Sequence, residues 1–223
     1  MTKISLLGFI FTVAFLSCTS YAIDKFAPQN MSISESGVKL IGRFEGVREK
    51  TYVCIGGKPT IGFGHVVKAS EVGKYSGILA EAEGYKLLSV DVVEVYEPDI
   101  KRLVTVPLSQ GQFDALTSFD YNLGAKNLGA STLLKHLNGG DDHQASLQFP
   151  LWRNANGQYL PGLFKRRIAE MFIFRGEDII PDDLATIPTK TQGETLLTVY
   201  QALAEPLKQE AKDIFLAYKA NWR

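Results

Sequence analysis

The sequence predicts a mainly helical α+β fold of two lobes, with a small β-hairpin sheet in the N-terminal lobe. Apolar residues recur at helical spacing through 81–103 and again after Ser109. A β-rich stretch over 51–63 is divided by Gly56-Gly57, which is a hairpin signal. The 223 residues are enough for one compact domain, or for two small lobes around one cleft.

The N-terminal lobe is predicted to begin with a helix from about Ser34 to Gly46, after a polar linker over 23–33. Ser32 and Glu35 have the spacing of a capping box, in which each side chain accepts from the backbone of the other residue. The hairpin over 51–63 follows this helix, so that helix end and hairpin are consecutive in the chain.

The next helix, over 81–103, is long enough to connect the two lobes. Pro98 lies inside it and is expected to kink or split it, because proline has no N–H to donate. Ser109 and Gln112 then open a second-lobe helix in capping-box form. Short helices punctuated by glycines follow, and Leu163–Phe174 is predicted to be a further helix.

Both ends of the chain differ from this central part. Residues 1–22 have a short basic start, an apolar core and a small residue at Ala22, which is typical of a secretory signal cleaved after that position. A retained signal anchor is the alternative. Residues 177–223 read as a linker followed by a helical C-terminal extension of unknown role. Export to the periplasm or the cell exterior is therefore expected, with no stable membrane span after cleavage.

Charge and cysteine content limit the possible partners and chemistry. Lys+Arg and Asp+Glu are both 24, so the net charge gives no indication of nucleic-acid binding. The two cysteines are Cys18, within the signal segment, and Cys54. Cleavage would leave Cys54 as a single thiol, whereas a retained anchor would allow a disulfide between Cys18 and Cys54. His136 and His143 lack metal-ligand spacing, so neither metal nor cofactor is expected.

Three side chains of different chemistry follow one another around the predicted hairpin. Glu45 ends the apolar face of the first helix, Cys54 ends the first β-rich run, and Thr60 lies in the second. One carboxyl group thus faces a thiol and a hydroxyl. This arrangement suits acid-assisted attack on an acetal, because the acid can protonate the leaving oxygen while the other groups hold water.

The stretch from Phe44 to His65 resembles the phage-type lysozymes, also called endolysins or muramidases. Their motif is Glu, eight residues, Asp, five residues, Thr, followed by Ile-Gly-x-Gly-His. Glu45 and Thr60 match this spacing, and Cys54 stands where the family usually has Asp. Further sequence blocks that match the family follow in the expected order. They are Pro107–Phe119, Asn122-Leu-Gly124, Ser131–Leu134, Trp152, Gly157, Gly162-Leu163, Arg166-Arg167 and Glu170.

The resemblance covers about 33–176 and implies a two-lobed, lysozyme-like fold for a domain over 34–176. It implies hydrolysis of the β-1,4 bond between N-acetylmuramic acid and N-acetylglucosamine in peptidoglycan glycan strands, by a monomer, with Glu45 as general acid. Cys54 has two possible functional roles, as a base that orients water together with Thr60 or as a nucleophile. A purely structural cysteine is the third reading. An ionised Glu45 nearby would disfavour the thiolate, so water positioning is preferred.

Two further residues are candidates for contact with substrate. Asn122 would hydrogen-bond the sugar or the wall peptide, or only stabilise its own turn. His65 would lie on the cleft floor as a substrate-side or packing residue. Arg166-Arg167 is expected to pair with Glu170 and with acids of the first lobe. The competing functions are a wall-binding protein without catalysis, because the family's Asp is absent, and non-hydrolytic cleavage to anhydro products.

Overall fold

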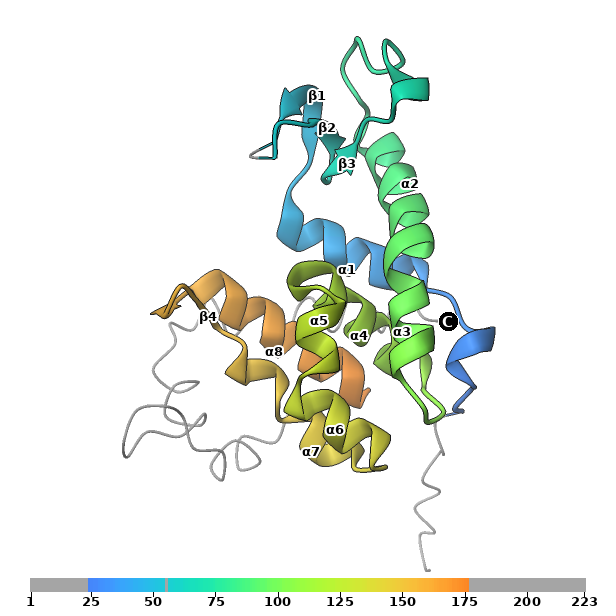
Figure 1. Cartoon of the computed structure of the whole chain (residues 1–223), viewed down its shortest axis with the longest axis vertical. Helices are drawn as coiled ribbons and strands as arrows, with labels where there is room; N and C mark the ends of the chain where they lie inside the picture. Colours follow the sequence, from blue (N-terminus) through green and yellow to red (C-terminus); the bar gives the residue numbers. More distant parts are fainter. Residues whose placement is uncertain (1–23, 55, 177–223) are drawn as a thin grey trace, which may run out of the picture.

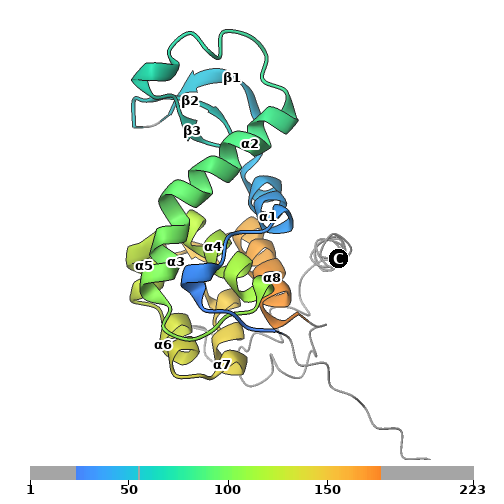
Figure 2. The same cartoon turned by 90° about the vertical axis from the view of Figure 1, so that its right-hand side faces the viewer.

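The computed structural model describes residues 24–54 and 56–176, and the predictions for 1–22 and 177–223 lie outside the described residues. The described chain forms two lobes, with the sheet in the upper lobe of Figure 1 and most helices in the lower one. Figure 2 shows the same division from the side, with a long helix running from one lobe to the other. The predicted helix-rich, two-lobed α+β fold is confirmed.

The upper lobe contains a three-stranded antiparallel sheet in the order β1-β2-β3. Its strands are β1 (Arg48–Val53), β2 (Pro59–Gly62) and β3 (His65–Val66), and the short 3-10 helix η2 (Ala69–Glu71) follows. Tyr52 pairs with Thr60 and Val53 with Pro59, so the predicted hairpin is confirmed and gains a third strand. β1 is exposed along its whole length, whereas β2 is buried after its first residue.

Helix α1 (Glu35–Glu45) precedes the sheet and is capped by Ser34, not by the predicted capping box. The Ser34 hydroxyl oxygen accepts from the Gly37 backbone at 3.0 Å, and it also donates to Asp114 Oδ2 at 2.6 Å. Ser32 instead donates to Glu97 at 3.3 Å. The Ser32–Glu35 prediction was therefore wrong, because tertiary contacts with two distant carboxylates decide which serine caps the helix.

A long, interrupted helix links the lobes, as Figure 1 shows on the right. It consists of α2 (Glu81–Asp91), a π turn labelled η3 (Val92–Tyr96) and α3 (Glu97–Leu103). Pro98 offers no N–H to the Glu94 carbonyl, four residues earlier, and the preceding Glu97 N–H reaches back five residues to Val92. The prediction that Pro98 interrupts this helix is confirmed.

The lower lobe is built around α4 (Gln110–Leu123), which packs against α1, α3 and α8 (Pro161–Arg175). The predicted capping box is confirmed, since Ser109 accepts from the Gln112 backbone at 3.2 Å and Gln112 accepts from the Ser109 backbone at 2.9 Å. The remaining elements are η1 (Pro28–Asn30), α5 (Ala125–Gly129), α6 (Thr132–Asn138), α7 (Asp142–Ser146), η4 (Phe149–Leu151), β4 (Asn154–Ala155) and β5 (Gln158–Tyr159).

The small hairpin β4–β5 was not predicted, although Asn156-Gly157 between its strands is a two-residue turn signal with positive φ at both positions. Buried apolar side chains form two clusters. The larger fills the lower lobe and includes Phe113, Leu116, Phe119, Phe149, Phe164 and Phe172; the smaller lies beneath the sheet and consists of Val38, Ile41, Phe63, Leu88 and Val92. Each lobe thus has its own core, with α1 and the long helix contributing to both.

Candidate active site

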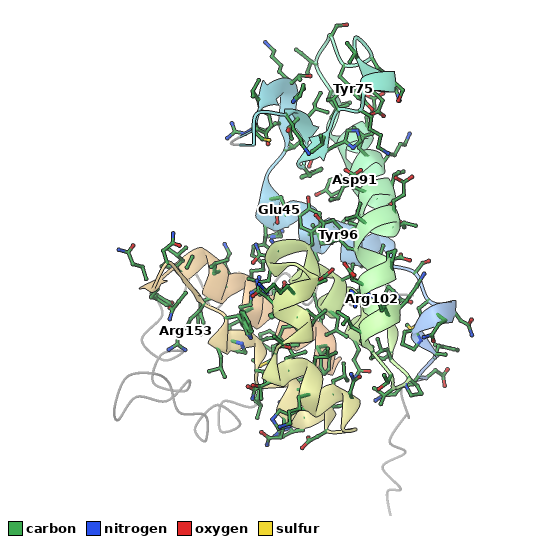
Figure 3. The ribbon with its side chains drawn as sticks, in the orientation of Figure 1. Glu45, Tyr75, Asp91, Tyr96, Arg102 and Arg153 are labelled. Carbon is green, nitrogen blue, oxygen red and sulfur yellow. The ribbon has the colours of Figure 1, made fainter. Side chains whose placement is uncertain are left out.

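Glu45 is the last residue of α1, and Figure 3 shows it between the two lobes. Gly46 ends the helix with a φ of 72°, a conformation that glycine adopts without strain, and the chain then turns into β1. The Glu45 side chain is 27% exposed, and its Oε1 accepts a hydrogen bond from Arg166 Nη1 of α8 at 2.5 Å. The carboxyl group is therefore held in place on one oxygen and remains partly open to solvent.

Arg166 is itself almost fully buried and is fixed at three points besides Glu45. Its Nε donates to Glu170 Oε1 at 3.1 Å, and its Nη2 donates to the Ser118 carbonyl at 3.0 Å and to the Ser118 hydroxyl at 3.3 Å. The Ser118 hydroxyl donates in turn to Glu170 at 2.7 Å. The expected pairing of Arg166 with Glu170 and with an acid of the first lobe is confirmed, and the acid is Glu45.

Arg167, the next residue of α8, extends this network to Asn122. Its Nη1 lies 2.9 Å from Glu170 Oε2, and its Nη2 donates to Asn122 Oδ1 at 2.6 Å. Burial lowers the pKa of Arg167 to about 10, against the opposing effect of Glu170. The Asn122 carbonyl oxygen is thus occupied by protein, while its amide nitrogen has no hydrogen-bond partner among the described residues.

Cys54 follows β1 directly and opens the hairpin turn. Its backbone N–H donates to the Lys58 carbonyl at 3.0 Å, its carbonyl accepts from Gly57 at 2.8 Å, and its thiol is partly exposed. Hydrogen bonds from the Lys58 backbone, and then from the Thr60 hydroxyl, lower the pKa of the thiol. Burial opposes this shift of the pKa but is outweighed by the local donors, so the environment of Cys54 favours the thiolate, contrary to the expectation that Glu45 would disfavour it.

Thr60 lies beside Cys54 on β2 and is almost fully buried. Its hydroxyl donates to the Lys58 carbonyl at 3.0 Å. A hydroxyl has one proton, so it can donate either to this carbonyl or to a Cys54 thiolate, but not to both. The structure thus brings Cys54 and Thr60 together on one hairpin, and Glu45 together with Arg166, with only Gly46 and Val47 between the end of α1 and β1.

His65 is 4% exposed, and both of its ring nitrogens are engaged within the upper lobe. Nδ1 lies 2.9 Å from Asp91 and Nε2 lies 2.9 Å from Glu71. Burial opposes protonation of the ring, but hydrogen bonds to Glu71 and Asp91 outweigh it, so the pKa of His65 is raised. Figure 3 shows Asp91 on the long helix with Tyr75 above it, and Tyr75 donates to Glu71 at 3.3 Å.

Sequence reasoning missed two tyrosines between the lobes. Tyr121 of α4 donates from its hydroxyl to the Phe63 carbonyl at 2.8 Å, and its ring packs on Tyr96 with centroids 4.7 Å apart. Tyr96 comes from the π turn and lies level with Glu45 in Figure 3. No sequence signal marked them: Tyr121 shares its side of α4 with polar Ser118 and Asn122, and its contact with Phe63 joins residues 58 positions apart.

Within residues 24–54 and 56–176, no three His, Cys, Asp or Glu side chains are grouped so as to hold a metal ion. In the same part of the chain, no helix combines the length and apolar character needed to cross a bilayer. A surface hollow of about 610 Å³ is lined by Val47–Tyr52 and begins two residues after Glu45.

Comparison with known proteins agrees with this geometry. The phage lysozyme family model matches residues 42–170. The chain is 39% identical over 148 residues to an endolysin of Acyrthosiphon pisum secondary endosymbiont phage 1, covering 65% of this chain and 98% of that one. It is 40% identical over 146 residues to the Bacillus phage B103 endolysin, again over 65% of this chain, but spans only 54% of that protein's length.

Among solved structures, a mutant of P22 lysozyme superimposes with a TM-score of 0.58 and 35% identity, covering 65% of this chain and 99% of that one. The two-lobed, mainly helical fold with a small sheet, together with the family match, places the chain in the class of lysozyme-type glycoside hydrolases. The chain belongs to the phage lysozyme family.

Proposed function

We propose that this protein is an exported muramidase that hydrolyses the β-1,4 bond between N-acetylmuramic acid and N-acetylglucosamine in bacterial peptidoglycan. The observation that carries the proposal is the Glu45 carboxyl, held on one oxygen by Arg166 and partly open between the lobes. The endolysin names of its relatives support the same activity. We assign the hollow along Val47–Tyr52, which begins two residues after Glu45 in the chain, to the passage of the glycan strand.

In this proposal Glu45 protonates the leaving oxygen of the glycosidic bond. Arg166 occupies Oε1, so Oε2 is the atom available to carry and deliver the proton. Because Arg166 is fixed by Ser118 and Glu170, the orientation of the carboxyl is set before substrate arrives. Such preorganisation lowers the barrier, since the reacting groups need not be ordered during the reaction.

We assign Cys54 and Thr60 the task of holding the attacking water. The thiol is partly exposed and has a lowered pKa, so a larger fraction of it is thiolate, the form that can accept a proton from water. The Thr60 hydroxyl can donate to the thiolate or accept from the water. Water attack on the face opposite the leaving group inverts the anomeric carbon, whereas attack by the Cys54 sulfur would retain its configuration through a covalent intermediate.

The remaining site predictions separate into one substrate contact and one scaffold residue. The free amide nitrogen of Asn122 can donate to a sugar hydroxyl or an acetamido carbonyl, and Arg167 fixes its direction by holding the carbonyl oxygen. His65 is buried, and two carboxylates use both of its nitrogens. We therefore assign His65 to the scaffold of the sheet lobe and not to the sugar.

The test is mass spectrometry of muropeptides released from purified peptidoglycan by residues 23–223. Reducing N-acetylmuramic acid ends are expected from the wild type and are expected to be lost in Glu45→Gln and Cys54→Ala. Cys54→Asp is expected to retain activity, because a carboxylate is the family's usual residue here. Glu83→Gln, at an exposed position of α2 outside the hollow, is the matched control and is expected to behave as wild type.

Other product patterns would contradict parts of the proposal. Anhydro ends would identify non-hydrolytic cleavage. Saturable binding to peptidoglycan without any soluble product would show a binding protein whose site was disabled by Cys54. Full activity of Cys54→Ala would remove the thiol from the mechanism while leaving Glu45 in place. The anomer formed first, read by NMR on a soluble glycan, would distinguish water attack from a covalent route.

Export rests on residues 1–22, and we propose cleavage after Ala22. The intact mass of the protein recovered outside the inner membrane tests this directly. A mature chain beginning at Ile23 is expected. A full-length chain whose Cys18 and Cys54 are joined under non-reducing conditions would instead show a retained anchor that blocks the thiol.

A further inference from the structure

Tyr121 forms a direct hydrogen bond between the two lobes. Its hydroxyl donates to the Phe63 carbonyl at 2.8 Å, and Phe63 immediately follows β2, the strand that carries Thr60. The separation of 58 residues along the chain means that this contact depends entirely on how the lobes are packed. Tyr121 therefore connects the middle of the helical lobe to the strand that bears the proposed water-holding residue.

The same face of α4 also holds the support of Glu45. Ser118, Tyr121 and Asn122 are three and four residues apart, so they lie on one side of the helix. Ser118 binds Arg166 and Glu170, while Asn122 binds Arg167. One turn of α4 thus supports the acid through the arginine network and the hairpin through Tyr121.

The surroundings of Tyr121 place its hydroxyl near the reacting groups. Burial, followed by the charge of Glu45, raises the pKa of Tyr121 well above its ordinary value, and Arg166 opposes this rise. The hydroxyl thus remains protonated and able to donate at any pH at which the protein would work. Tyr96 packs against the ring, which restricts its rotation and keeps the hydroxyl directed at Phe63.

We propose that Tyr121 is a positioning residue that sets the separation between Glu45 and the Cys54–Thr60 pair by holding the end of β2 against α4. The inference rests on the proposed function, because that separation matters only if acid and water-holding groups act together. The distance between the two groups determines whether a water fits between them, and misplacement by about 1 Å can cost a hundredfold in rate. Tyr121 acts on the reaction through geometry alone.

The decisive variant is Tyr121→Phe, which removes the hydroxyl and keeps the ring. One lost hydrogen bond of about 1 kcal/mol changes the equilibrium constant between the correct and the displaced lobe arrangements roughly fivefold, so kcat on a soluble peptidoglycan fragment is expected to fall by up to about fivefold. KM is expected to change less than kcat, because the groups that line the hollow along β1 are untouched. Tyr96→Phe is the matched control, since the Tyr96 hydroxyl has no hydrogen-bond partner among the described residues.

Hydrogen–deuterium exchange supplies a readout that is independent of activity. Faster exchange is expected over residues 59–66 in Tyr121→Phe, with α1 and α8 unchanged and with Tyr96→Phe identical to wild type. Faster exchange with an unchanged kcat would overturn the positioning role. Unchanged exchange would overturn the claim that the hydroxyl holds the strand. Absence of any product from the wild type would overturn the proposed function and, with it, the positioning role, while exchange would still report on the contact.

Discussion

Arg166 of α8 donates to Glu45 of α1 at 2.5 Å, so the last residue of the first helix is held by a side chain 121 positions away. The same guanidinium binds Glu170, which is completely buried. The proposed catalytic acid is therefore one end of an ion-pair network whose other end is inside the helical lobe. Removing the arginine affects the site and the core together.

Arg166→Met is expected to lower the free energy of unfolding by about 3–5 kcal/mol, because among the described residues it leaves buried Glu170 with Arg167 as its one cationic partner. Muramidase activity is expected to be lost as well, since Glu45 is no longer oriented. Urea denaturation measures the first effect. Arg102→Met is the control: its ion pair with Asp99 is at the surface, so a change below about 1 kcal/mol is expected. Equal losses in the two variants would contradict this account.

Asp120→Asn is expected to stabilise the protein at alkaline pH. Asp120 is completely buried, and neither of its carboxylate oxygens has a hydrogen-bond partner among the described residues. Burial raises its pKa from 3.8 to about 7; Asp99 adds to the rise and Arg102, labelled on α3 in Figure 3, opposes it. Tyr96 also lies within electrostatic reach.

The folded state thus binds more protons than the unfolded state between pH 3.8 and about 7. The unfolding free energy therefore falls as pH rises through that window. Above it Asp120 is ionised in both states, and the destabilisation reaches its full value, on the order of 4 kcal/mol. Urea denaturation at pH 4, 6 and 8 should show that the unfolding free energy of Asp120→Asn increases relative to that of wild type as pH rises. Asp24→Asn, at an exposed position, should not. If the unfolding free energies of wild type and Asp120→Asn changed with pH in the same way, ionisation of Asp120 would not destabilise the folded protein.

His65→Asn is expected to destabilise the sheet lobe most strongly in weakly acidic solution. Because the folded-state pKa of His65 is raised, its contribution is fully present below the unfolded value of 6.5 and is lost as pH rises through the folded value. The hydrogen bond from His65, more than any other group, lowers the pKa of Glu71 from 4.5 to about 2, so that contribution is lost as pH falls from 4.5.

The combined effect should therefore be largest between about pH 4.5 and 6.5 and should amount to about 2 kcal/mol. The measurement is the difference in unfolding free energy between wild type and variant across a pH series. His143→Asn is the control, because His143 is exposed and distant from these carboxylates in the chain. A difference that grows steadily above pH 7 would contradict the sign of the His65 shift.

Features formed by residues close together in the chain could be predicted from sequence. The Ser109–Gln112 capping box, the interruption at Pro98 and the Gly56-Gly57 hairpin each depend on interactions within a few residues. The spacing from Glu45 through Cys54 to Thr60 also indicated the family, which the comparisons confirm. The roles of these three residues remain predictions.

The interactions that hold the site together depend on tertiary structure. Asp114 contributes to making Ser34, not Ser32, the cap of α1, and Arg166 reaches Glu45 from 121 positions away in the chain. The Tyr121 contact with Phe63 and the burial of Asp120 left no local pattern to detect. Sequence alone determined which chemical groups are present and how far apart they lie along the chain. Packing of two lobes decided which of them meet, because contacts between distant residues exist only once both cores have formed.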